Sequence, residues 1–421
     1  MTPENQKKHD EKEKRFFDAI ALKEPDRVPM SPPPELFPIF NAGYTVAEVL
    51  YDPSLEKMKH AVIKYLNEFD PDISWGLGFI LAGEGPGLEL AKPKNLRWAG
   101  MPGQVIDENS IQQFLEYPLL HDNEFDEFFT DRTGWVLRRA LPRLSEMTEH
   151  FANFNIGGAF NSNMVFRQLT AQLSTPEAQA MIKNMWAMNE FYQGFNARAG
   201  AIIQEIIDLG YPAPICQYLT VPFDDYSDYL RGTLLSLADL YDRPEDIERF
   251  TEPKLEIVLN MLRASKGVND GKQVFMPLHK GMDGFMSDEH YRKYYWKHLK
   301  KIIETIIEVG KIPFIYTEGK YNQRLDCLAE VPPGKVLYHF EEVDMAEAKK
   351  KLGSTACISG GFRATLLDWG TPQQVRDEVK RLIDICAPGG GFIFATSCGI
   401  GNAKRENVEA MFEAVREFGK Y

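Results

Sequence analysis

Short apolar runs alternate with longer amphipathic stretches along most of the chain. Apolar runs of four to six residues bounded by turn residues are typical of buried strands. Nine runs are predicted as strands, at residues 28–31, 73–76, 155–160, 215–219, 274–278, 313–316, 336–340, 356–359 and 392–396. A closed barrel needs only eight, so at least one of the nine is expected to be wrong.

The stretches between the strands carry helical periodicity. The clearest helix is predicted over residues 288–309, with Ser287 as N-cap and Gly310 just past its end. Residues 345–352 and 372–386 repeat the pattern. Alternation of strands and helices predicts a parallel sheet, and right-handed crossovers leave a closed barrel or an open doubly wound sheet as the choices.

Residues 82–131 interrupt this rhythm. They are rich in glycine, proline and acidic residues and show no clean period. We interpret them as an insertion at the mouth of the fold, where functional loops collect. No domain linker is evident elsewhere, so residues 1–421 are expected to form one domain.

Composition narrows the partners and the compartment. The 421 residues are 44% hydrophobic and 26% charged, which is typical of a globular protein, and the net charge is −13. An acidic chain repels phosphate, so we expect no nucleic-acid partner. The sequence contains neither a membrane-length apolar run nor a signal peptide. Five scattered cysteines indicate a reducing compartment, which predicts a cytoplasmic protein.

Several segments, taken in order, resemble the uroporphyrinogen decarboxylase superfamily. They are residues 15–22, Pro-Asp-Arg-Val-Pro at 25–29, Arg-Gly at 231–232, residues 239–245, Leu366 with Gly-Thr-Pro at 370–372, residues 389–394, Cys-Gly-Ile at 398–400, Glu-Asn-Val at 406–408 and Ala-Met at 410–411. The resemblance covers most of the chain. It implies a single (β/α)8 barrel with an N-terminal helix and an insertion at its mouth.

The superfamily contains two chemistries. True decarboxylases resemble one another in an early arginine-rich segment that grips substrate carboxylates, but residues 30–37 here contain no arginine. The resemblance therefore favours the other branch, methyltransferases that work with a corrinoid. We expect transfer of a methyl group from a small methylated substrate, such as a methoxylated aromatic, to a corrinoid.

The corrinoid is expected on a separate protein. Corrinoid carriers resemble one another in an Asp-x-His-x-x-Gly segment. The nearest match here is Asp288-Glu-His290, where Lys293 stands in place of the glycine.

The resemblance also implies a zinc ion, held in that branch by His-x-Cys after a late strand and by a cysteine after the last strand. The matching positions are Tyr316, Glu318 and Cys398. Glu318 can replace a cysteine ligand, and His339, at the end of the next strand, could supply the nitrogen. The predicted ligands are therefore Glu318, His339 and Cys398. The alternative is that Glu318 and His339 bond loop amides and Cys398 packs as a small apolar residue.

Further candidates lie near other predicted strand ends. His279 and Asp283 could orient substrate or exchange a proton; alternatively His279 is the third zinc ligand, or only ties down its loop. Predicted substrate contacts are Trp75, Phe79, Phe160, Asn161, Asn163, Arg167, Phe285 and Tyr316. For the aromatic residues the alternative is core packing, and for the polar ones it is capping of the next helix.

Two rival functions stay open. One is a metal-free lyase of the decarboxylase type that uses a carboxylate such as Asp283. The other is a small-molecule-binding barrel without catalysis. Metal content separates the methyltransferase from both.

Overall fold

Six strands form one parallel sheet in which spatial order follows chain order. The computed structural model describes residues 1–78, 80–155 and 161–421. The strands are β3 (Ile215–Tyr218), β4 (Gln273–Leu278), β5 (Ile312–Lys320), β6 (Leu337–Glu342), β7 (Cys357–Gly360) and β8 (Phe392–Ile393). They match six of the predicted runs.

Two short extended segments close this sheet into a barrel. Met30 bridges Phe394, just past β8, in parallel. The amide of Asp72 then donates to the Met30 carbonyl at 2.8 Å, and the amide of Ser74 donates to the carbonyl of Pro212, just before β3, at 2.8 Å. These segments correspond to the predicted runs 28–31 and 73–76. The ring therefore has eight members, and the predicted (β/α)8 barrel is confirmed. The ninth run, residues 155–160, falls outside the described residues except for Asn155, which is not in a strand.

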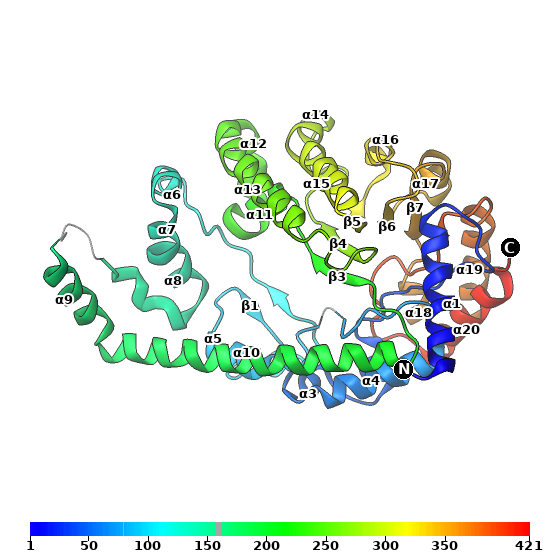
Figure 1. Cartoon of the computed structure of the whole chain (residues 1–421), viewed down its shortest axis with the longest axis horizontal. Coiled ribbons are helices and arrows are strands. Elements are labelled where there is room, and N and C mark those ends of the chain that lie inside the picture. Colours follow the sequence, from blue (N-terminus) through cyan, green and yellow to red (C-terminus); the bar gives the residue numbers. More distant parts are fainter. Residues whose placement is uncertain (79, 156–160) are drawn as a thin grey trace.

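Helices surround the ring (Figure 1). They are α1 (Pro3–Ile20), α2 (Phe37–Asn41), α3 (Val46–Leu50), α4 (Glu56–Phe69), α11 (Pro222–Tyr226), α12 (Thr233–Asp242), α13 (Pro244–Ala264), α14 (Asp288–His290), α15 (Lys297–Glu308), α16 (Leu325–Leu328), α17 (Met345–Leu352), α18 (Thr365–Trp369), α19 (Pro372–Cys386) and α20 (Arg405–Phe418), with the π-helical turns η3 (Ser227–Arg231) and η4 (Tyr291–Trp296) and the 3-10 turn η5 (Asn322–Arg324). The long predicted helix is realised as α14, η4 and α15. The Ser287 side chain accepts from the His290 amide as its cap, and Gly310 takes a positive φ.

Between the second segment of the ring and β3, the chain leaves the barrel. This part contains α5 (Gly85–Ala91), the antiparallel pair β1 (Leu96–Arg97) and β2 (Gln113–Phe114), α6 (Phe125–Thr130), α7 (Arg132–Trp135), the π turn η1 (Val136–Ala140), α8 (Leu141–Leu144), the 3-10 helix η2 (Glu146–Asn153), α9 (Ser162–Leu173) and α10 (Pro176–Asp208). Figure 1 shows α10 running out from the barrel, with α9 at its far end. We call residues 77–208 the excursion; the predicted insertion, residues 82–131, forms its first part.

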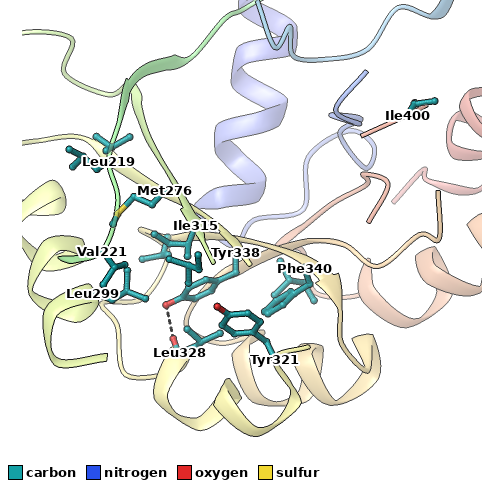
Figure 2. Packing of buried hydrophobic residues seen from close by; sticks show 14 of the residues in the cluster. Leu219, Val221, Met276, Leu299, Ile315, Tyr321, Leu328, Tyr338, Phe340 and Ile400 are labelled. Carbon is teal, nitrogen blue, oxygen red and sulfur yellow. Dashed lines mark hydrogen bonds between the residues drawn. The ribbon is translucent and has the colours of Figure 1, made fainter. Parts of the chain in front are cut away.

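Apolar packing joins the sheet to the outer helices. Figure 2 shows Tyr338 and Phe340 of β6 among the buried side chains of this outer core. The Tyr338 hydroxyl donates to the Leu328 carbonyl at 3.0 Å, which satisfies its polar end. Among the residues that the structure describes, none of the helices has the length and hydropathy of a transmembrane segment.

Inside the barrel, alternate residues of the strands form layers. Phe275, Phe314 and Leu337 pair across β4, β5 and β6 as a buried floor, into which Trp75 also packs. Two residues further along come Pro277, Tyr316 and His339, which pair in the same way. Two residues beyond these come His279, Glu318 and Glu341, where the register between β5 and β6 shifts after Thr317 and the Gly319 amide donates to the Glu341 carboxylate. This third layer reaches the C-terminal mouth, where such barrels carry their active sites.

Candidate active site

The mouth of the barrel contains a cavity of about 240 Å³. Its floor and walls are Pro33, Glu35, Tyr218, Phe275, Pro277, His279, Tyr316, Glu318 and Gly399. The lining thus combines three aromatic rings with two carboxylates and one histidine. It includes neither lysine nor arginine.

His279 is fixed at this mouth by two carboxylates. Its Nδ1 lies 2.5 Å from Oδ2 of Asp228, and its Nε2 lies 3.8 Å from Oε1 of Glu318. Asp228 also pairs with the Lys280 ammonium at 3.1 Å. Since Nδ1 is engaged by Asp228, Nε2 is the nitrogen available toward the cavity.

The surroundings favour the charged form of His279. Burial opposes the charge, but the hydrogen bond to Asp228 and the charges of Asp224 and Glu318 outweigh it and raise the pKa of His279 to about 9. The imidazole is therefore protonated at neutral pH. This pair contributes stability that is complete below pH 6.5 and is lost as the pH rises through about 9.

Asp224 holds the backbone of the loop that carries His279. Its fully buried carboxylate accepts hydrogen bonds from the Tyr295 hydroxyl at 2.7 Å and from the backbone amides of His279 at 3.3 Å and Lys280 at 2.9 Å. Burial raises the pKa of Asp224 to about 7, although the charge of His279 opposes the rise. Asp224 therefore positions the loop that carries His279.

The carboxylates at the mouth raise one another's pKa values through charge repulsion, in addition to the larger effect of burial. Burial raises the pKa of Glu318, helped by the charges of Glu341 and Asp228, while His279 lowers it. Burial also raises the pKa of Glu35, which feels the charge of Glu318. Glu35 takes a positive φ of 41°, uncommon for a residue with a side chain. A Cβ atom on Gly399 would overlap its carboxylate, so only glycine leaves room for Glu35 here.

His339, one of the predicted zinc ligands, is engaged by other partners in this structure. It lies one layer below the mouth and is 1% exposed. Its Nε2 lies 3.1 Å from the Ser397 carbonyl, which can only accept, so Nε2 carries the proton and Nδ1 accepts from the Ser359 hydroxyl at 3.0 Å. Burial lowers the pKa of His339 to about 4. Both nitrogens are occupied, and neither has a lone pair free for a metal.

Glu318 faces the cavity, and Cys398 lies beside it next to Gly399. Burial raises the pKa of the Cys398 thiol, as do the charges of Glu341 and Glu35, while the Ser397 hydroxyl opposes the rise. Across residues 1–78, 80–155 and 161–421, no three His, Cys, Asp or Glu side chains are placed to hold a metal together. The predicted ligand set therefore does not fit a zinc ion.

Asp283 does not line the cavity. Its carboxylate accepts from the Gln323 amide at 3.1 Å and lies 3.9 Å from Nε of Arg324. These contacts tie the loop after β4 to η5. Asp283 is therefore a loop anchor, and its prediction as a catalytic residue is not supported.

The predicted substrate contacts divide into three groups. Tyr316 lines the cavity and stacks on His339, with ring centroids 4.3 Å apart. Trp75 and Phe285 pack in the two cores, which is the alternative considered for them. Phe79 and Phe160 lie outside the described residues.

The three polar candidates are misplaced as substrate contacts. Asn161 caps α9 through the Asn163 amide at 3.1 Å, and Asn161, Asn163 and Arg167 are all exposed on that helix. Figure 1 places α9 at the end of α10 far from the sheet. The capping alternative is therefore what the structure shows.

Comparison with known proteins places this barrel in a family. Residues 200–418, about half of the chain, match the family described as uroporphyrinogen decarboxylase (URO-D). The chain belongs to the uroporphyrinogen decarboxylase family. This confirms the resemblance seen in the sequence.

Bacterial uroporphyrinogen decarboxylases are among the relatives of this chain. Uroporphyrinogen decarboxylase from Pseudomonas fluorescens is 26% identical over 187 residues, which is 43% of this chain and 51% of that protein. The corresponding enzyme from Neisseria meningitidis is 22% identical over 185 residues, with the same coverage. The chain thus spans about half the length of the curated relatives it matches.

A solved structure matches nearly the whole chain. It is a methyltransferase from Methanosarcina mazei, with a TM-score of 0.60, 15% sequence identity and coverage of 97% of this chain and 98% of that one. At this identity the likeness shows the fold alone.

Asp228 is expected to set the charge of His279. Asp228→Asn should lower the pKa of His279 from about 9 toward or below its ordinary 6.5, because the first partner of Nδ1 loses its charge while burial remains. Histidine ring NMR across pH measures the change. Asp225→Asn is the matched control, since Asp225 pairs with Lys254 at 2.6 Å and not with His279. An unchanged His279 pKa in Asp228→Asn would refute the assignment.

Proposed function

We propose that this protein is a methyltransferase that moves a methyl group from a small methylated substrate to a corrinoid carried on a separate protein. The observation that carries the proposal is the charge of the mouth. Glu35 and Glu318 line it without a lysine or arginine among the lining residues. Such a site repels a polycarboxylate and suits a neutral or cationic methyl donor.

The same observation weakens the rival lyase. A porphyrinogen with eight carboxylates needs several cations, and the lining of the mouth offers only the His279 imidazolium. The carboxylate considered for that lyase, Asp283, is engaged by Gln323 and Arg324 outside the cavity.

The residues of the mouth suit removal of a methyl group from a heteroatom. When the carbon–heteroatom bond breaks, its electron pair stays on the heteroatom, which then needs a proton. His279, protonated at neutral pH with Nε2 toward the cavity, can donate that proton as a general acid. Asp228 holds the ring in place, and Glu318 can orient the substrate and stabilise the imidazolium. The reduced corrinoid, as co-substrate, receives the methyl group.

The proposed acid–base chemistry does not depend on a zinc ion. The expectation came from the resemblance, and His339 is unavailable as a ligand. The acid–base role proposed for His279 relies only on side chains of this chain. The metal content of purified protein, measured by mass spectrometry, tests the zinc expectation independently of turnover.

A donor screen tests the proposal. Purified protein is mixed with reduced cobalamin and with methyl ethers, methylamines, methanol or methyl thiols, and methylation is followed in the visible spectrum. We expect methylation with at least one neutral or cationic donor and none without protein. Absence of methylation with every donor, together with carbon dioxide release from a carboxylated substrate, would favour the lyase instead.

A further inference from the structure

A larger apolar groove lies beside the mouth, between the excursion and η3. It has a volume of about 610 Å³, within the range of sites that enclose drug-sized molecules. Its lining comes from β2, α7, η1 and α8 on one side and η3 on the other, namely Asn95, Phe114, Leu115, Glu116, Tyr117, Leu119, Trp135, Val136, Ala140, Leu144, Asp228, Tyr229, Leu230 and His279.

Several large apolar side chains that line the groove are exposed to solvent. Phe114 is 72% exposed, Tyr229 53% and Leu115 43%, and all three face this one hollow together with Val136. Contiguous exposed apolar surface of this kind marks a binding site more often than it marks ordinary surface.

Hydrogen bonds connect the two walls of the groove and fix their relative position. The amides of Leu119 and Leu120 both donate to the Leu230 carbonyl at 2.8 Å. Glu116 accepts from the Thr233 amide at 2.8 Å, which fixes the excursion to the start of α12. The groove is therefore preformed, which lowers the entropy lost on binding.

The groove and the mouth share His279. This residue lines both hollows, and Asp228, which lines the groove, is its hydrogen-bond partner. η3, a π-helical turn of a type often found at functional sites, carries Asp228 next to Tyr229 and Leu230. A molecule lying in the groove therefore has one end against His279 on the side of Asp228, and the Nε2 atom of the same ring faces the adjoining mouth.

The carboxylates that line the groove already have hydrogen-bond partners. Glu116 is bound to Thr233, and Asp228 to His279 and Lys280. The remaining lining is almost wholly apolar, so a charged body would lose its hydration without finding a partner.

We propose that the groove is a second substrate compartment, which takes a neutral, apolar body of drug size while the methyl-bearing heteroatom sits between His279 and Glu318. This inference rests on the proposed function for the identity of the reacting group. In this arrangement the apolar part of the substrate contacts the excursion. Methanol and methylamine, which lack such a part, would occupy only the cavity at the mouth.

Binding of neutral methyl ethers of growing size tests the compartment without turnover. By titration calorimetry, methoxynaphthalene is expected to bind about tenfold more tightly than methoxybenzene, since the added ring buries further apolar surface. Val136→Glu places a charge in the groove and should weaken methoxynaphthalene binding about tenfold. Leu234→Glu, at a side chain 79% exposed outside the groove, is the matched control and should bind as the wild type does.

Phe114→Ser provides a second variant with little risk to folding, because Phe114 is largely exposed. It should weaken methoxynaphthalene binding severalfold. Equal affinities along the ether series, or wild-type affinity in both groove variants, would overturn the compartment even if small donors methylate cobalamin. Conversely, groove-dependent binding without methyl transfer from any donor would overturn the proposed function and leave the compartment standing.

Discussion

His279→Gln is expected to lower the rate of methyl transfer by about 10²–10⁴-fold. Glutamine keeps a polar side chain of similar size but cannot deliver the proton that the departing heteroatom needs. Substrate affinity should change much less than the rate, because the cavity keeps Glu318 and its aromatic walls. Steady-state kinetics with reduced cobalamin as acceptor separate the two effects.

The matched control for His279→Gln is His121→Gln. His121 is exposed and lies in the excursion, outside the lining of the mouth. It should transfer methyl groups at the wild-type rate. A wild-type rate in His279→Gln would remove this residue from the chemistry.

Arg231→Met is expected to cost about 3–5 kcal/mol of unfolding free energy. The Arg231 guanidinium is 1% exposed and bonds Asp239 at 2.6 Å, Asp122 at 2.6 Å and the Leu120 carbonyl at 2.6 Å. Methionine approximates the length of the side chain but leaves the buried Asp239 carboxylate with only the Tyr226 hydroxyl at 2.6 Å and the Arg243 guanidinium at 4.0 Å. Because Leu120 and Asp122 belong to the excursion, the same change should loosen it from the barrel.

Urea denaturation measures the free energy, and limited proteolysis reports on the excursion. Asp122→Asn removes only the partner that is 67% exposed and should cost no more than about 1 kcal/mol. If Arg231→Met were no more destabilising than Asp122→Asn, the buried pair with Asp239 would not be the anchor described above.

Local signals in the sequence were sufficient for individual strands and helices, whereas the resemblance to the family selected the closed barrel over an open sheet. The helix predicted over residues 288–309 begins at a serine cap and ends at a glycine, and the structure keeps both ends. The helices α17 and α19 have the predicted bounds. Each of these elements pairs an apolar stripe with its own start and stop residues, so that no distant contact is needed to place it.

The site was harder to predict because its residues meet only through the fold. Asp228 lies 51 positions before His279 and sits in an acidic run, Asp-Asp-Tyr-Ser-Asp at 224–228, that could equally be a solvated helix. That run begins at Asp224, shortly after β3 ends at Tyr218, and its place past a strand end could have indicated a site. Glu35 follows three prolines in a loop with a positive φ, which no periodicity reveals.

The position of His339 could have been predicted better from the alternation of side chains along paired strands. It was assigned to the mouth because it stands near a strand end. However, Tyr316 pairs with His339, and Glu318 lies two residues beyond Tyr316 toward the mouth, so Glu318 and His339 belong to different layers. Glu341 accepts from the Gly319 amide at 2.5 Å, beside Glu318. Counting alternate residues along paired strands would have separated the two layers.

We propose that this URO-D barrel transfers a methyl group at the mouth formed by His279 and Glu318. The most direct measurement follows a ¹³C-labelled methyl group by NMR, from a donor found in the screen to reduced cobalamin, in the wild type and in His279→Gln. We predict that the label moves to cobalamin, that the demethylated product appears in equal amount, and that His279→Gln slows both together. Label that stays on the donor while the protein releases carbon dioxide from a carboxylated substrate would contradict the account.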